Sequence, residues 1–459
     1  MPSDEIHKME QQIPNLIKDI HSDNPDDILH ASTEIRKLLQ IDNSPFLSKI
    51  INSGGLPTFI KLLSWDDHPQ IQFECCWILT NLAASTSDHT KLLIDEGAIK
   101  PLVKLLKSDD ESIRQQACWT LGNITCDSDE NRDLILHTNA FPLILDIVKN
   151  LDDLKLETVQ TVSWTISNIL RSIREAPRIE YFKQAIPFLS KLLDYRDEEV
   201  LKDTCWSLVY GISQENIAIT SRIQFVIDID PLLCSKVIKL LYYKNIDLQT
   251  PSIRFISFIS SDIINSKDNI YSKTLISSFY NLLQIPRISH MNDTIWSLSQ
   301  IITADEEQIK ELIDGGLVPI LVNLLNNADS PVQIDIFLIL SNSIVNTTSP
   351  KQLLYLLSQS CLKSILNFYL YGSASTDPTL PNEKLIRILL ICIENILNIF
   401  LFDNNNKQNN QYYQQCLKNL QDSNGLLFLK KLQNHSNKYI KDKTNTILKK
   451  ISNNNNNNK

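Results

Sequence analysis

The sequence is poor in glycine and has no long uninterrupted hydrophobic run. Only 9 of its 459 residues are glycine. Because sheets with many tight turns need more glycine, this scarcity favours long helices joined by short turns and predicts an all-α protein. No segment approaches the ~18 consecutive apolar residues of a membrane-spanning helix, and the first residues contain no apolar signal-peptide core. We therefore expect no membrane partner.

Motifs for disulfide, metal and catalytic chemistry are also missing. The 9 cysteines show no CxxC and no regular spacing, so we expect buried free thiols. The 8 histidines are scattered, and the chain contains no HExxH, no GxSxG and no glycine-rich phosphate loop. We therefore expect neither an enzyme nor a cofactor or metal. The net charge of −9 disfavours nucleic acid as a partner and favours basic peptides.

The chain contains an internal repeat with a period in the low forties. Tryptophan is scarce, yet four of the 6 tryptophans follow one another at steps of 42 to 45 residues, and Trp296 comes 90 residues after the fourth. Prolines that each predict a helix start follow the same period. Helical repeats of this length are typical of armadillo and HEAT solenoids. The periodic positions are Trp77, Trp119, Trp164 and Trp206, with Pro57, Pro101, Pro142, Pro187 and Pro231.

The helix that carries each tryptophan has a recurring sequence: CWILTNL at 76–82, CWTLGNI at 118–124 and SWTISNI at 163–169. Three apolar residues at i, i+4 and i+7 form its predicted core stripe. Trp and Asn lie two residues out of phase with that stripe, roughly 160–200° around the helix. The tryptophans are thus predicted to form a row outside the core, the tryptophan ladder. The stripe residues are Cys75, Leu79, Leu82, Ala117, Leu121, Ile124, Val162, Ile166 and Ile169.

Such a ladder has the chemistry of a groove for an extended basic peptide. Neighbouring indole rings can hold the stem of a lysine and attract its charge by ~0.5–2 kcal/mol each. Asparagine can bond both the C=O and the N–H of a peptide backbone. Glu74 and Asp127 are candidate partners for ammonium groups. An isolated tryptophan is more often buried, and a single surface acid is more often only solvated, but a periodic row of exposed aromatics favours binding.

The repeat, the ladder and several segments resemble the importin α family, whose armadillo adaptors bind nuclear localisation signals. The resemblance runs from about residue 10 to about 452 and implies a right-handed superhelix of about ten armadillo repeats with two peptide grooves. We expect a solenoid over residues 1–449, with an Asn-rich insert at about 403–411, and a disordered poly-Asn tail at 450–459. The segments are CWTLGNITCDSDENRDLIL (118–136), RIQFVID (222–228), IENILNI (393–399) and LQNHSN (432–437).

The resemblance also implies the residues that line each groove. Those of the major groove are Trp77, Asn81, Thr86, Trp119, Asn123, Asp127, Trp164, Asn168, Trp206 and Tyr210. Ser85 and Cys126 stand where the family has glycine, and Ser213 stands where it has an acid. The minor groove is more eroded, since Phe258 replaces an asparagine and Leu338 a tryptophan. Its remaining residues are Arg254, Asp293, Trp296, Gln300, Asp335 and Asn342.

The implied function is that of a nuclear import adaptor, present in cytoplasm and nucleus, whose partners carry Lys/Arg-rich nuclear localisation signals. The basic importin-β-binding segment of the family has no counterpart in the first 50 residues, and the Asn-rich end has no acidic run for an export receptor. We therefore expect signal binding without autoinhibition and poor coupling to importin β. A competitor that binds signals without transporting them is one alternative, and a general armadillo scaffold is another.

Overall fold

In the computed structural model, all the regular secondary structure of the described residues is helical. Within the described ranges no β-strand occurs, and no helix is long and apolar enough to cross a membrane. This agrees with the all-α solenoid predicted from the sequence. The described residues are 3–41, 45–213, 226, 228–265, 270–284, 288–302, 306–327, 331–371, 382–401, 407–422 and 425–457.

The chain divides into two compact units, Met1–Phe255 and Ile256–Lys459. The boundary falls inside one helix, α16. The helices of the first unit are α1 (Ser3–Asp19), α2 (Pro25–Leu39), α3 (Leu47–Asn52), α4 (Leu56–Leu62), α5 (Pro69–Ala83), α6 (Ser87–Asp95), α7 (Ile99–Leu105), α8 (Glu111–Asp127), α9 (Asp129–Leu136), α10 (Ala140–Ile147), α11 (Leu156–Leu170), α12 (Ile179–Leu192), α13 (Glu198–Ile212), α15 (Leu233–Leu240) and the start of α16 (Ile246–Asn265), with a 3-10 turn at Leu151–Asp153.

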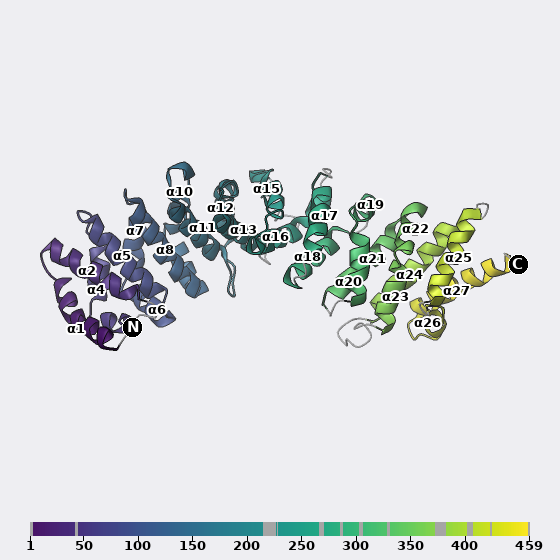
Figure 1. Cartoon of the computed structure of the whole chain (residues 1–459), viewed down its shortest axis with the longest axis horizontal. Coiled ribbons are helices and arrows are strands. Elements are labelled where there is room, and N and C mark those ends of the chain that lie inside the picture. Colours follow the sequence, from purple (N-terminus) through teal and green to yellow (C-terminus); the bar gives the residue numbers. More distant parts are fainter. Residues whose placement is uncertain are drawn as a thin grey trace. The chain divides into compact units, whose positions relative to one another are not determined.

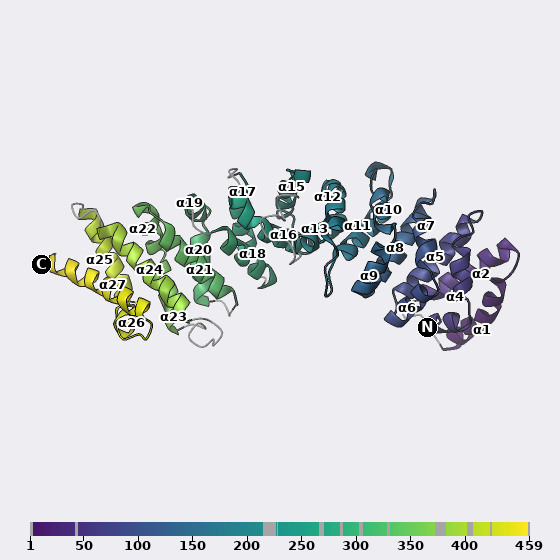
Figure 2. The ribbon, with the colours of Figure 1, turned by 180° about the vertical axis from the view of Figure 1, so that it is seen from behind.

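In the second unit, longer helices pack on one another in chain order. Within it α18 packs on α21, α21 on α24 and α24 on α27 (Figure 2). Its helices are the end of α16, α17 (Ile270–Leu283), α18 (Ile288–Ile301), α19 (Glu306–Asp314), α20 (Leu317–Asn327), α21 (Pro331–Asn346), α22 (Pro350–Ser358), α23 (Cys361–Tyr371), α24 (Asn382–Leu401), α25 (Lys407–Asp422), α26 (Gly425–Leu432) and α27 (Lys438–Asn457).

Several repeats within the described residues contain three helices, one more than the sequence pattern predicts, whereas only α12 lies between α11 and α13. In the first unit a short helix such as α6 precedes the proline helix α7 and the tryptophan helix α8. The tryptophan helices pack in chain order, α5 on α8, α8 on α11 and α11 on α13, and α2 packs on α5 as the first member of the series (Figure 1). We call α2, α5, α8, α11 and α13 the ladder helices.

The core stripe predicted for α5, α8 and α11 is confirmed. All nine predicted stripe residues are at most 1% exposed. Local signals fix the helix ends: the Asp110 carboxylate accepts a hydrogen bond from the Ser112 N–H at 2.8 Å as the N-cap of α8. Gly97, before α7, has a φ of +81°, which a residue with a Cβ adopts only with strain.

Two expectations about helix boundaries need correction. Pro187 does not start a helix but lies inside α12, because the preceding segment from Ile179 is already helical. The predicted disordered tail at 450–459 begins within α27, which continues to Asn457. Asparagine is a weak helix former, but extending a packed helix costs little per residue. The predicted Asn-rich insert lies partly outside the described residues, and α25 begins at Lys407.

Candidate functional site

The ladder tryptophans of the first unit lie outside the core, as their phase predicts. Trp119 is 39% exposed, and Trp77, Trp164 and Trp206 are half-buried. Each comes from a different ladder helix, and these helices contact one another in order. The four rings therefore follow one another along neighbouring helices of one unit.

A buried polar seam joins α5 to α8 beneath the ladder. The hydroxyls of Thr80 and Thr120 are hydrogen-bonded to each other at 2.7 Å. The Gln116 amide donates to the Thr80 hydroxyl, also at 2.7 Å. Sliding α5 along α8 would break these hydrogen bonds and leave buried polar groups unpaired, which costs free energy. The seam thus fixes the offset between Trp77 and Trp119.

The asparagines that follow the tryptophans are oriented by backbone carbonyls. Asn81 and Asn168 donate from Nδ2 to the carbonyl oxygens of Trp77 and Trp164, each at 3.0 Å. Asn123 instead donates to the Thr80 carbonyl of the preceding ladder helix at 3.2 Å. All three side chains are half-buried. Each carboxamide is thus held in place by one of its two N–H groups.

Asp127 lies at the C-terminal end of α8, where three helices meet. Its carboxylate accepts hydrogen bonds from the Ser87 hydroxyl at 2.5 Å and from the Asn131 amide at 2.8 Å. Thr86, the N-cap of α6, precedes Ser87 and is exposed. The structure therefore brings the predicted residues Thr86 and Asp127 to the same corner. Next to Asp127, burial raises the pKa of the Cys126 thiol to about 11, so this thiol is protonated at neutral pH.

Glu74, a predicted partner for a ligand ammonium group, is already paired with a cation of the protein. It is 8% exposed and forms an ion pair with Arg36 of α2. The Arg36 guanidinium also lies over the Trp77 ring, 4.9 Å from its centroid. The sequence pattern could not reveal this contact, because α2 carries no tryptophan and the two residues are 38 positions apart.

At the other end of the first unit, Trp206 and Tyr210 form a stacked pair with ring centroids 5.5 Å apart. The resemblance assigned Arg254 to the minor groove, but its guanidinium lies 5.4 Å from the centroid of Trp206, a ring of the predicted major groove. Burial raises the pKa of Asp203, three residues before Trp206, to about 6, although Lys202 opposes this shift. Asp203 was missed, yet its spacing from Trp206 equals that of Glu74 from Trp77.

Trp164 packs on the backbone of the preceding ladder helix. An ideal Cβ on Gly122 of α8 would lie 2.6 Å from Trp164 Cζ3 and 2.7 Å from Thr165 Oγ1. Real contacts of this kind are not so short, so the position requires glycine. Gly122 therefore sets how closely the Trp164 ring approaches α8, a role that its place in CWTLGNI did not suggest.

The predicted minor groove has a different character in the second unit. Trp296 is 39% exposed, and its ring forms an edge-to-face pair with Phe258 at a centroid distance of 6.0 Å. Burial raises the pKa of the half-buried Asp335 carboxyl. Asp293 and Asn342 are half-buried. The side chain of Gln300 lies outside the described residues.

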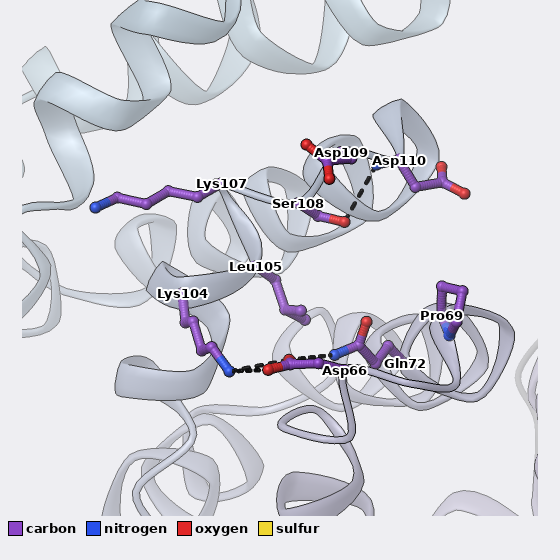
Figure 3. Close-up of a pocket in the computed structure, with 9 residues that line it drawn as sticks. All are labelled: Asp66, Pro69, Gln72, Lys104, Leu105, Lys107, Ser108, Asp109 and Asp110. Carbon is purple, nitrogen blue, oxygen red and sulfur yellow. Dashed lines mark hydrogen bonds and ion pairs between the residues drawn. The ribbon is translucent and has the colours of Figure 1, made fainter.

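A separate hollow of about 500 Å³ lies between α5 and α7, at the start of α8 (Figure 3). Lys104 donates to both carboxylate oxygens of Asp66, at 2.9 and 2.6 Å, and this hydrogen bonding lowers the pKa of Asp66. The hollow contains no ladder residue. In the described part of the chain, no three His, Cys, Asp or Glu side chains are grouped so that they could hold a metal ion.

Comparison with known proteins supports the armadillo repeat and a specific family. The Armadillo/beta-catenin-like repeat matches residues 43–84 and 86–126. Importin subunit alpha-4 of Arabidopsis thaliana is 35% identical over 366 residues, 80% of this chain and 66% of that protein. Importin subunit alpha-B of Dictyostelium discoideum is 46% identical over 254 residues, 55% of this chain and 48% of that protein. Importin subunit alpha-1a of Oryza sativa subsp. japonica is 32% identical over 71% of this chain and 60% of that protein.

The matched regions span about half to two thirds of the length of these relatives. Among solved structures, an engineered protein superposes with a TM-score of 0.68, covering 96% of this chain and 99% of that chain. At 21% identity this likeness concerns the fold alone. The repeated three-helix unit and the similarity to several importin α subunits together show that the chain belongs to the importin α family of armadillo-repeat proteins.

Proposed function

We propose that the chain binds short Lys/Arg-rich nuclear localisation signals along the tryptophan ladder of its first unit, as an adaptor for nuclear import. The observation that carries this proposal is the row of Trp77, Trp119, Trp164 and Trp206 outside the core on successive ladder helices. The names of the importin α relatives point to the same role. The protein would then work in both cytoplasm and nucleus.

In this proposal the lysine stems of the signal lie between neighbouring indole rings, where each ring attracts the charge by ~0.5–2 kcal/mol. The carboxamides of Asn81, Asn123 and Asn168 bond to the peptide backbone, which makes this part of the recognition independent of sequence. Asp127 at the corner of α8 pairs with one ammonium group. These features favour a basic ligand, whereas a general scaffold for acidic partners would need a basic groove.

The test is a fluorescence-anisotropy titration of a labelled lysine-rich peptide with the unaltered chain and with the double variant Trp119→Ala/Asn123→Ala. Removing a central ring and a backbone clamp should weaken binding by at least ~2 kcal/mol, about thirtyfold. Raising the salt concentration should weaken binding by the unaltered chain, because salt screens the attraction between its carboxylates and the lysines of the peptide. An unchanged dissociation constant in the double variant would remove the ladder from the proposal.

The competitor hypothesis requires a second measurement. A pull-down with purified importin β, with and without the signal peptide, separates an adaptor from a protein that only holds signals. We expect an adaptor to retain importin β and peptide together. Peptide binding without importin β would favour the competitor.

A further inference from the structure

At each end of the series of ladder tryptophans in the first unit, the protein places an arginine side chain over the indole ring. Arg36 of α2 lies 4.9 Å from the centroid of the first ring, Trp77. Arg254 of α16 lies 5.4 Å from the last ring, Trp206. Within the described residues, Trp119 and Trp164 have no such cation. In the described part of the chain, the protein thus places a cation on each of the two end rings, Trp77 and Trp206, and on neither of the two inner rings.

Arg36 is fixed in this position by more than the indole. Its Nε pairs with Glu74, and the two side chains are only 17% and 11% exposed. The Trp77 ring in turn forms an edge-to-face pair with Phe73, with ring centroids 5.5 Å apart and an interplanar angle of 88°. A largely buried ion pair is costly to break, since one charge is left without its partner. Arg36 therefore stays on Trp77 when no ligand is present.

Arg36 makes the contacts that the proposed function assigns to a ligand lysine. It places a cation on an indole face and next to a carboxylate, and both partners come from α5. A lysine of a signal peptide cannot occupy the same face of Trp77 and would also meet a like charge there. The guanidinium still has N–H groups beyond the one that pairs with Glu74, and these suit a carboxylate or a carbonyl oxygen.

We propose that Arg36 closes the α2 end of the groove and so sets where the basic run of a bound signal must stop. The residue that follows the run at this end is then neutral or acidic, and a further lysine is rejected. This inference rests on the proposed function, since it concerns the same groove. It makes Arg36 a specificity-determining residue rather than a part of the general affinity for basic peptides.

The test uses labelled peptides that share one lysine run. One has alanine at both flanks, and the others carry glutamate or lysine at one flank or the other. The unaltered chain should bind the glutamate peptide about fivefold more tightly than the lysine peptide at one flank only, because a partly exposed ion pair has a modest effect. The flank that shows this preference is the one that lies at α2.

Arg36→Gln should abolish the preference at that flank. It should also improve binding of the lysine-flanked peptide about tenfold, because Glu74 is then left for the ligand. Arg36→Lys should keep the preference. Lys104→Gln is the matched control. It removes one positive charge, whose partner Asp66 lies 2.6 Å away in the hollow of Figure 3, and it should leave the preference at both flanks unchanged.

Equal preferences in the unaltered chain and in Arg36→Gln would overturn the inference, as would the same change in Lys104→Gln. If Arg36→Gln does not fold because Glu74 is left unpaired, Arg36→Gln/Glu74→Gln replaces it and should show no flank preference. A preference that persists in this double variant also overturns the inference. The alanine-flanked peptide keeps the two proposals apart: its binding by the unaltered chain upholds the proposed function even where the flank effects fail, and its failure to bind overturns both.

Discussion

The two units are built from the same helical repeat but differ in how they use the surface outside the core. In the first unit, four tryptophans follow one another on consecutive ladder helices, and asparagines held by backbone carbonyls stand four residues after three of them. In the second unit, Trp296 meets Phe258 where the ladder pattern would place an asparagine. The core that builds a repeat and the surface that would bind a peptide can therefore change independently.

A physical reason underlies this independence. The stripe residues of the ladder helices are buried, so replacing them would leave cavities and destabilise the unit. The ladder residues lie on the opposite side of the same helices, where a substitution such as Asn to Phe leaves the core unchanged. The half-buried Phe258 ring packs against Trp296. A phenyl ring offers no hydrogen bond to a peptide backbone, unlike the asparagine that it replaces. We therefore expect the two units to differ in peptide affinity but not in fold.

The largest expected effect comes from reversing the charge at Asp127. Asp127→Lys should weaken binding of a lysine-rich peptide by more than about a hundredfold, because a like charge then faces the ligand. Asp127 accepts two hydrogen bonds, from Ser87 and Asn131, so the free energy of unfolding should fall by no more than about 2 kcal/mol. Isothermal titration and thermal unfolding measure the two quantities. Asp127→Asn should be intermediate in affinity, and an unaffected Asp127→Lys variant would exclude Asp127 from the groove.

The direct comparison of the units uses one substitution in each. Trp164→Ala should weaken binding of a short basic peptide about tenfold, because it removes a ring from the ladder. Trp296→Ala should change the affinity less than about twofold, which is the effect expected when a residue outside the binding centre is truncated. Both variants lose one indole, so each is the control of the other in the same anisotropy titration. Equal losses would contradict the difference drawn between the units.

A smaller effect is expected from a position that touches no ligand. Gly122→Ala places a methyl group 2.6 Å from Trp164 Cζ3, so the ring must shift. Alanine is a better helix former than glycine by about 1 kcal/mol, but overpacking costs about 1–3 kcal/mol. We expect a net loss of stability and an affinity reduced about fivefold, less than a full ring removal under the same assay. Unchanged affinity with a lower unfolding temperature would show that the position of the ring is not critical.

Much of the fold could be predicted because it depends on local periodicity. The core stripe with Cys75, Leu121 and Ile166 follows from the 3.6-residue turn, and all three side chains are fully buried. The merged helix α12 could not be predicted from Pro187, because a proline preceded by helical sequence loses its value as a start signal. The third helix, where a repeat has one, was missed because segments such as α6, with 9 residues, are short and only partly apolar.

The position of the ladder tryptophans outside the core could be predicted from the sequence, but their contacts could not. The phase of Trp119 on its helix indicates exposure, and the structure agrees. The pairing of Glu74 with Arg36 joins two helices of different repeats, and no spacing within either helix encodes it. The same holds for the contact of Arg254 with Trp206. Contacts between repeats depend on how neighbouring helices pack, and a pattern read within one helix contains no information on that.

The smallest expected effect is a pH dependence confined to the first unit. Burial raises the pKa of Asp203 to about 6, above the value of about 3.9 in an unfolded chain. Between pH 4 and 6 the folded state therefore binds more protons than the unfolded state, so the free energy of unfolding decreases as the pH rises through this window.

Ionised Asp203, near Trp206, attracts a cationic ligand, so affinity for a lysine-rich peptide should fall about threefold from pH 7.5 to pH 5. The peptide lysines stay charged throughout this range. Titrations at both pH values with the unaltered chain and with Asp203→Asn measure the effect. Asp203→Asn should remove most of the dependence and flatten the fall in stability between pH 4 and 6. A full pH dependence retained in Asp203→Asn would assign the effect to another group and leave Asp203 outside the groove.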